Sequence, residues 1–195
     1  MKSRFLRSKL AVFLIVFLVF VGVMVTYSMV YRQESFSRSV LLVTSMGNMT
    51  IGLYDDMNIT AANFINLTEL GVYDGTIFHR VVYNFVIQGG DPTGTGQGDP
   101  SIASIPDELP NRHSNSVGAV AMAKKSLQDG HAQPNSASSQ FFINLNDNGG
   151  QLNAEYSVFG KVISGMDVAY SIGNVETTSE RPNQNVTIIK AQLVK

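Results

Sequence analysis

Short runs of apolar residues, most of them β-branched or aromatic, recur along this chain from residue 40 to its end. Gly, Pro, Asn, Asp and Ser separate these runs, which is typical of short strands joined by turns. Only two stretches, residues 58–70 and 165–173, place apolar residues at helical spacing. Many short strands with two helices predict an all-β domain, either a barrel or a sandwich.

The first strands are predicted to form a β-hairpin over residues 40–54, with a tight turn at Gly47-Asn48. A second apolar stretch, residues 78–91, is expected to bend in the middle and divide into two strands. Residues 93–116 are rich in Gly, Pro, Ser and Asp and predict a long loop. Further strands are expected at residues 117–122, 140–144, 156–162 and 186–194.

The N-terminal part of the chain has a different pattern. Residues 10–31 are 22 consecutive residues without a charge, dominated by Val, Phe, Leu and Ile. At about 1.5 Å per residue, a helix of this length reaches about 33 Å, enough for a hydrocarbon core of about 30 Å. A cleaved signal peptide usually has a shorter apolar region, and a buried globular helix is the remaining alternative. We therefore expect an uncleaved transmembrane signal anchor that crosses the membrane once.

The charges beside this segment predict its orientation. The residues before it include four basic and no acidic ones: Lys2, Arg4, Arg7 and Lys9. Such a cluster favours a cytoplasmic N-terminus. We expect a cytoplasmic tail over residues 1–9, an anchor in the cell membrane over 10–31, a linker over 32–39 and an extracytoplasmic domain over 40–195.

Composition excludes several classes of function. From Gln33 onward the chain has 9 Lys and Arg against 15 Asp and Glu, a net charge of −6, which argues against nucleic-acid binding. The absence of cysteine excludes disulfides, thiol catalysis and cysteine-based metal sites. The three histidines show no metal-ligand spacing. We expect neither a metal nor a cofactor.

One stretch carries candidate chemistry. Arg80, Phe85 and Gln88 are separated by five and three residues in an otherwise apolar region. With a bend near Tyr83-Asn84, two short strands would place all three side chains on one face. The result would be a fixed cation, an aromatic wall and an amide. The pattern alone leaves open an ordinary reading, because an arginine in a strand is usually a surface or ion-pairing residue.

Four blocks of sequence carry a resemblance. They are Tyr-Asp-Gly-Thr-Ile-Phe-His-Arg-Val at 73–81, Phe-Val-Ile-Gln-Gly-Gly-Asp-Pro-Thr-Gly-Thr-Gly at 85–96, Ser-Ser-Gln-Phe-Phe-Ile-Asn at 138–144 and Val-Phe-Gly-Lys-Val at 158–162. In this order they resemble cyclophilins, the peptidyl-prolyl cis-trans isomerases, from about Val40 to the C-terminus. The resemblance implies an all-β fold: an eight-stranded antiparallel barrel capped by two helices.

The resemblance also implies an activity and its residues. Isomerisation of an X-Pro bond breaks no covalent bond, so the site needs only an apolar pocket and a donor that favours the twisted amide. The implied catalytic residues are Arg80, Phe85 and Gln88. The implied substrate-binding residues are Met122, Ala123, Gln140, Phe142, Leu152 and Tyr156. Proline-containing polypeptides, exported across the membrane, are the expected partners, and we expect a monomer.

Two departures from the family pattern bear on specificity. The segment between Ala123 and Gln140 is longer than in many members and flanks the expected groove. Gln151 stands where several members carry an aromatic residue, so we expect weak cyclosporin binding. A membrane-tethered chaperone or assembly module on the same scaffold is the alternative function, since fold alone does not decide activity. An unrelated ligand-binding barrel is a more distant alternative.

Overall fold

The computed structural model describes residues 13–24 and 34–194. The chain divides into two compact units, Met1–Glu34 and Ser35–Lys195. In the first unit, residues 13–24 form a helix. The second unit contains all of the strands described below.

The described part of the chain contains no helix with both the length and the apolar character needed to cross a membrane. The anchor expected over residues 10–31 extends beyond the helix at 13–24 in both directions. Its remaining residues, 10–12 and 25–31, lie outside the described residues, as does the basic tail at 1–9.

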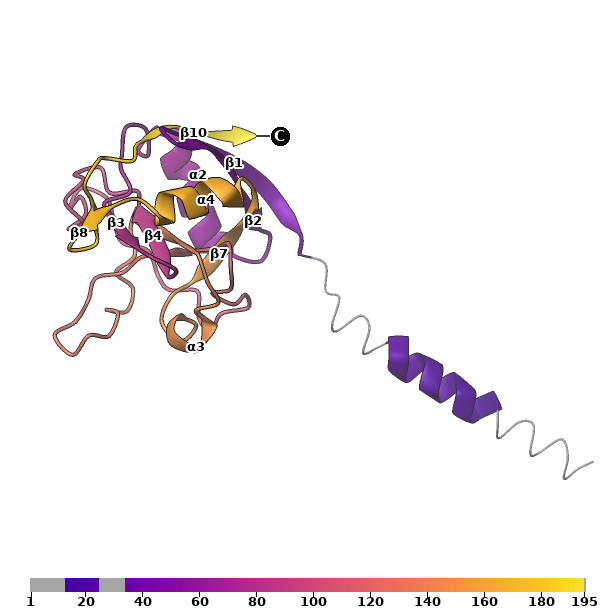
Figure 1. The fold of residues 1–195 in the computed structure, drawn as a ribbon. Coiled ribbons are helices and arrows are strands. Elements are labelled where there is room, and N and C mark those ends of the chain that lie inside the picture. The colour runs from indigo at the N-terminus through magenta and orange to yellow at the C-terminus, as the bar shows by residue number, and fades with distance from the viewer. Residues whose placement is uncertain (1–12, 25–33, 195) are drawn as a thin grey trace, which may run out of the picture. The chain divides into compact units, whose positions relative to one another are not determined.

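The folded domain is built on one eight-stranded antiparallel sheet in the order β10-β1-β2-β7-β5-β6-β4-β3 (Figure 1). Its strands are β1 Phe36–Thr44, β2 Gly47–Tyr54, β3 Arg80–Val82, β4 Val86–Gly89, β5 Ala119–Met122, β6 Phe141–Asn144, β7 Val158–Ser164 and β10 Ile188–Val194. A separate two-stranded sheet pairs β8 Thr177–Thr178 with β9 Arg181–Pro182.

The sheet curls so that the segments beside its two outermost strands meet. Ile77, before β3, forms an antiparallel bridge with Thr187, before β10. Phe78 N donates to Val186 O over 2.9 Å, next to this bridge. These contacts join the ends of the sheet and confirm the antiparallel eight-stranded architecture that the resemblance implied.

The described domain also contains three helices. The two expected from apolar spacing are present as α2 Asn58–Glu69 and α4 Met166–Gly173. The sequence did not predict α3, Gly149–Leu152, because four residues are too few to show helical periodicity. α2 contacts β10 and β7, whereas α4 contacts β2, β3 and β4 (Figure 1).

Two predicted boundaries need correction. The first hairpin turns at Ser45-Met46, because Thr44 pairs with Gly47 and Gly47 already begins β2. β1 begins at Phe36, so the strand includes residues 36–39, which we had expected in the linker.

The core is rich in aromatic side chains. Phe64 on α2 is fully buried. Its ring centroid lies 4.9 Å from that of Tyr73, 5.3 Å from that of Phe141 and 5.0 Å from that of Phe159. Phe141 belongs to β6, the strand that also carries Phe142 into the candidate site. Packing of α2 therefore supports the strand that forms one wall of the site.

Candidate active site

A single hairpin places the two polar candidates next to each other. β3 and β4 pair so that Arg80 lies opposite Gln88. Asn84 makes the turn between them with a φ of +54°, a region that Asn adopts more readily than most residues. Phe85 follows the turn, and all three expected residues line one cavity of about 860 Å³. The bend predicted from the sequence is confirmed.

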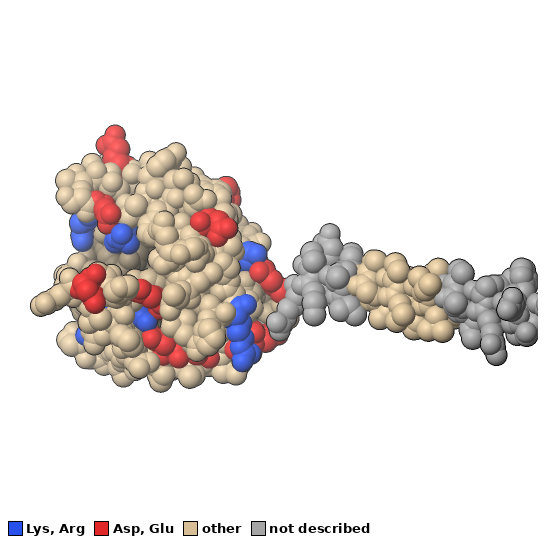
Figure 2. Space-filling view, turned by 90° about the horizontal axis from the view of Figure 1, so that it is seen from below, with Lys and Arg blue, Asp and Glu red and all other residues tan. Residues whose placement is uncertain are grey.

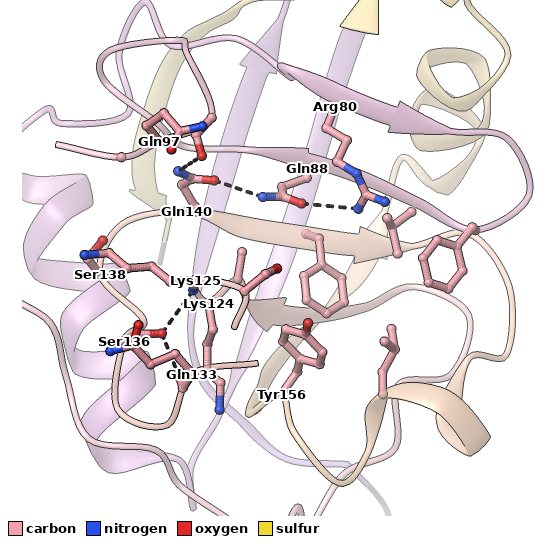
Figure 3. A pocket seen from close by; sticks show the side chains of 18 residues that line it. Arg80, Gln88, Gln97, Lys124, Lys125, Gln133, Ser136, Ser138, Gln140 and Tyr156 are labelled. Carbon is pink, nitrogen blue, oxygen red and sulfur yellow. Dashed lines mark hydrogen bonds between the residues drawn. The ribbon is translucent and has the colours of Figure 1, made fainter. Parts of the chain in front are cut away.

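A row of hydrogen bonds crosses the cavity wall (Figure 3). Arg80 Nη1 donates to Gln88 Oε1 over 3.5 Å, and Gln88 Nε2 donates to Gln140 Oε1 over 2.9 Å. Gln140 Nε2 then donates to the carbonyl of Gly96 over 3.1 Å. The row orients both glutamine amides and connects strands β3 and β4, through the residue directly before β6, to the long loop.

Glu180 holds the other side of the guanidinium. Its Oε2 lies 2.6 Å from Arg80 Nε, and the backbone carbonyl of Glu180 accepts a hydrogen bond from Val81 N over 2.7 Å. Among the residues that the structure describes, no group accepts a hydrogen bond from Arg80 Nη2. Glu180 was not predicted from the sequence, because no local pattern links it to a strand that lies 100 residues earlier.

Phe85 is fixed through its backbone. Its carbonyl accepts hydrogen bonds from Leu145 N over 2.8 Å and from Asn148 Nδ2 over 3.0 Å. Asn148 is buried and also donates to Asn144 Oδ1 over 2.9 Å. Asn148 is a second positioning residue that was not predicted from the sequence, where its only local signal is an asparagine after a buried strand.

One end of the cavity is apolar. Phe85, Val86, Phe142, Leu152 and Tyr156 all line the cavity. The rings of Phe142 and Tyr156 meet edge to face with centroids 5.4 Å apart. Burial raises the pKa of the Tyr156 hydroxyl, so the ring remains neutral at physiological pH. This end offers a wall of carbon atoms on which a small apolar ring can pack.

Asp91 shapes the loop on the opposite wall, where Gly96, Gln97 and Gly98 line the cavity. The carboxylate of Asp91 is buried and accepts hydrogen bonds from Thr93, Gly96 and Gly98. Burial acts to raise the pKa of Asp91, but these hydrogen bonds lower it below its ordinary value. The loop therefore forms around a buried charge.

The structure brings eight of the nine expected site residues to this cavity: Arg80, Phe85, Gln88, Ala123, Gln140, Phe142, Leu152 and Tyr156. The ninth, Met122, is buried in β5 and is not among the lining residues. Every residue of this short strand is buried, so Met122 contributes to the core behind the site. Among the described residues, no group of three or more His, Asp or Glu is arranged to hold a metal ion.

Residues 39–193 match the family model described as cyclophilin type peptidyl-prolyl cis-trans isomerase/CLD. The peptidyl-prolyl cis-trans isomerase ppi1 of Schizosaccharomyces pombe is 43% identical over 158 residues, which cover 78% of this chain and 97% of that protein. A peptidyl-prolyl cis-trans isomerase of Acinetobacter baylyi is 43% identical over 152 residues, covering 75% of this chain and 78% of that protein.

Solved structures show the same similarity. A cyclophilin type peptidyl-prolyl cis-trans isomerase of Cryptosporidium parvum superposes with a TM-score of 0.73 and 31% identity, covering 81% of this chain and 98% of that one. A structure of the same protein in the presence of the dipeptide Ala-Pro gives a TM-score of 0.72, covering 80% of this chain and 99% of that one.

Proposed function

This chain belongs to the cyclophilin-type peptidyl-prolyl cis-trans isomerases, and on that premise we propose that Arg80 lowers the barrier to X-Pro rotation. The barrier, about 18–20 kcal/mol, comes from the amide resonance that a rotating peptide bond must lose. In the twisted amide the prolyl nitrogen regains a lone pair. A donor aimed at that lone pair stabilises the transition state more than the planar ground state, which is the condition for catalysis.

The geometry of Arg80 carries this proposal. Glu180 holds its Nε and Gln88 its Nη1, which leaves Nη2 as the donor without a partner among the described residues. An arginine stays charged at all physiological pH values and keeps its donors in a rigid plane. With the plane fixed by two neighbours, the remaining donor needs little reorganisation when a substrate twists beside it.

We place the proline ring at the apolar end of the cavity, against Phe85, Phe142 and Leu152. The edge-to-face contact with Tyr156 fixes the Phe142 ring, so the wall is formed before substrate enters. The related Cryptosporidium parvum protein has a structure determined in the presence of Ala-Pro, which supports a proline-containing peptide as the ligand. Gln88, Gln140 and Ala123 would then face the substrate backbone.

The test is X-Pro exchange in a proline peptide, measured by NMR with the full chain and three variants. Arg80→Ala should lose roughly 10²- to 10³-fold in kcat/KM, in the range seen when a transition-state donor is removed. Arg80→Lys should recover only a small part of the lost activity, because a single ammonium group cannot reproduce the oriented, planar donors of the guanidinium. Arg38→Ala, on β1 away from the cavity, is the control. If the wild type binds the peptide without accelerating exchange, the tethered binding module becomes the better account.

We also propose that residues 10–31 anchor the chain in the cell membrane, with the N-terminus cytoplasmic and the isomerase domain outside, where it assists exported proteins. The support is the uncharged apolar stretch and the four basic residues before it. Protease added to intact cells should degrade the domain, and alkaline washing should leave the chain in the membrane fraction. Release by washing, or protection from the protease until the cells are lysed, would contradict this proposal.

A further inference from the structure

The lining of the cavity differs in charge from the rest of the domain. Residues 33–195 carry a net charge of −6, and acidic side chains are spread over the face drawn in Figure 2. The residues that line the cavity nevertheless include three cations, Arg80, Lys124 and Lys125, and no Asp or Glu. The interior of the site is therefore cationic within an acidic domain.

Two of the three cations are neutralised by acids outside the lining. Arg80 pairs with Glu180 over 2.6 Å. The side chain of Lys124 is 3% exposed, and its Nζ lies 2.8 Å from Asp107 Oδ2. Lys125 is exposed and forms no ion pair within the part of the chain that the structure describes. Lys125 is therefore the lining cation without an acidic partner among the described residues, and its charge is available to a side chain of a ligand.

The backbone of Lys125 is held in place although its side chain is exposed. Lys125 N donates to Ser136 Oγ over 3.0 Å, and Lys125 O accepts from Gln133 N over 2.7 Å. The segment from 125 to 133 forms a small hairpin, with an antiparallel bridge between Ser126 and Ala132, that projects from the domain (Figure 1, salmon loop). Lys125 therefore belongs to a structured wall of the cavity.

Acidic groups near this hairpin are engaged with other partners. Asp129 Oδ1 accepts from His131 N over 3.0 Å. Glu155 accepts from His131 Nδ1 over 2.7 Å and from Ala132 N over 2.6 Å. Neither carboxylate belongs to the cavity lining. The charge of Lys125 is thus not cancelled within the site.

The surroundings of Lys125 suit a polar side chain. Gln133, Ser136 and Ser138 line the same end of the cavity, and in Figure 3 they lie with Lys125 on the side away from Arg80 and Tyr156. Hydroxyl and amide groups beside a cation form a favourable environment for a carboxylate. Nothing at this end resembles the apolar wall where we place the proline ring.

We propose that Lys125 is a specificity-determining residue that selects substrates with an acidic side chain shortly before the proline. This inference rests on the proposed function, which places the prolyl nitrogen beside Arg80. The residue before the proline is bonded to that nitrogen, and its backbone passes Gln140 and Ala123. Ala123 and Lys125 lie two residues apart in the same lining, so this placement directs the side chains that precede the proline toward Lys125.

The test uses the full chain and peptides with one proline, in which either Glu or Gln stands at each of three positions before and after it. The quantity compared is the ratio of kcat/KM for the Glu peptide to that for the matched Gln peptide. For the wild type the ratio should be about two- to fivefold at a position before the proline, the range of a partly solvated ion pair. It should fall toward one in 0.5 M NaCl, because salt screens exposed charges.

Variants decide whether Lys125 is the cause. Lys125→Gln should bring the ratio close to one, and Lys125→Glu should bring it below one. Arg38→Gln, which makes the same charge change on β1, should keep the wild-type ratio. A wild-type ratio of one at every position, a preference found only after the proline, or a ratio unchanged in Lys125→Gln would each overturn the inference. In those cases the peptides still isomerise faster with enzyme, whereas failure of the proposed function would show as no acceleration of any peptide.

Discussion

Glu180 Oε2 lies 2.6 Å from Arg80 Nε, although the two residues are 100 positions apart in the chain. Glu180 reaches Arg80 from the turn between β8 and β9, where its φ is +65°. Since the carboxylate holds Nε and Gln88 holds Nη1, the plane of the guanidinium is fixed relative to the cavity. The orientation of the proposed catalytic donor thus depends on a residue outside the cavity lining.

Glu180→Gln should lower kcat about two- to tenfold and leave KM almost unchanged. The amide can still accept a hydrogen bond from Arg80, but the charge-assisted part of the contact is lost, a change of about 0.5–1.5 kcal/mol. The effect stays modest because the Glu180 side chain is 51% exposed. The measurement is kcat and KM from X-Pro exchange at several peptide concentrations.

Glu176→Gln, one residue before β8, provides the matched control and should leave both constants at their wild-type values. If Glu180 acts by positioning Arg80, Glu180→Gln should have no further effect in a chain that already carries Arg80→Ala. An effect of the same size in both backgrounds would show that Glu180 influences activity by another route.

Asp91→Asn should destabilise the domain by about 1–3 kcal/mol, the cost of leaving buried partners of a charged group unsatisfied. An amide oxygen cannot replace both carboxylate oxygens, which accept from Thr93, Gly96 and Gly98. Urea unfolding measures the loss, and faster amide exchange at Gly96 and Gly98 should accompany it. Asp99→Asn, on the same loop and closer to solvent, is the control and should cost less.

The same carboxylate predicts how stability responds to acid. The folded-state pKa of Asp91 lies below its ordinary value of 3.8. The contribution of the ionised Asp91 carboxylate to folding stability is therefore present above pH 3.8, and it is lost as the pH falls through the lowered pKa. Between pH 5 and pH 2 the wild type should lose more stability than Asp91→Asn does. Parallel curves of stability against pH for the wild type and Asp91→Asn would show that Asp91 does not cause this loss.

Residue spacing predicted the part of the site that lies on one hairpin, whereas the family resemblance supplied the lining residues on distant segments: Ala123, Gln140, Phe142, Leu152 and Tyr156. Arg80 and Gln88 belong to one hairpin, so their spacing and the bend at Asn84 were enough to bring them together. Contacts between distant segments left no local signal, and Glu180 and Asn148 were missed for that reason.

Met122 was expected in the site from the family resemblance, and the pattern of its strand could not correct that expectation. All four residues of β5 are buried, so no alternation of apolar and polar positions distinguishes the face toward the cavity from the face toward the core. The turn at Ser45-Met46 illustrates another limit. Gly47 has a φ of +133°, but it begins β2 after the turn, so glycine content alone misplaced the hairpin by two residues.

Phe64→Ala should destabilise the domain by about 3–5 kcal/mol, the usual cost of removing a buried phenylalanine. Phe64 packs against Tyr73, Phe141 and Phe159, and a cavity among these rings would leave α2 poorly anchored. Chemical denaturation gives the free energy of unfolding. Leu70→Ala is a suitable control, since Leu70 directly follows α2 and is 69% exposed. Comparable losses in the two variants would show that the aromatic cluster does not carry this stability.

The ion pair between His131 and Glu155 helps to hold the hairpin that carries Lys125 against the rest of the domain, and this pair responds to pH. Hydrogen bonding to Glu155 raises the pKa of His131 above 6.5, and Asp129 adds to the shift. The same bond, with that from Ala132 N, lowers the pKa of Glu155 below 4.5. The stabilisation that protonated His131 contributes is fully present below pH 6.5, and it is lost as the pH rises through the raised pKa of His131. The stabilisation that ionised Glu155 contributes is present above pH 4.5, and it is lost as the pH falls through the lowered pKa of Glu155. The contact between the two side chains is therefore strongest between about pH 4.5 and 6.5.

Raising the pH from 5.5 to 8.5 should therefore loosen the hairpin at residues 125–133. Amide exchange at Leu127 and Gln133, whose N–H groups close the hairpin, should lose protection once the intrinsic pH dependence of exchange is corrected for. The amide of Ile143, in the buried strand β6, serves as an internal control and should keep its protection. His131→Gln should make hairpin protection low and nearly independent of pH over this range. Equal protection at both pH values in the wild type would show that the backbone bonds of the hairpin suffice without the ion pair.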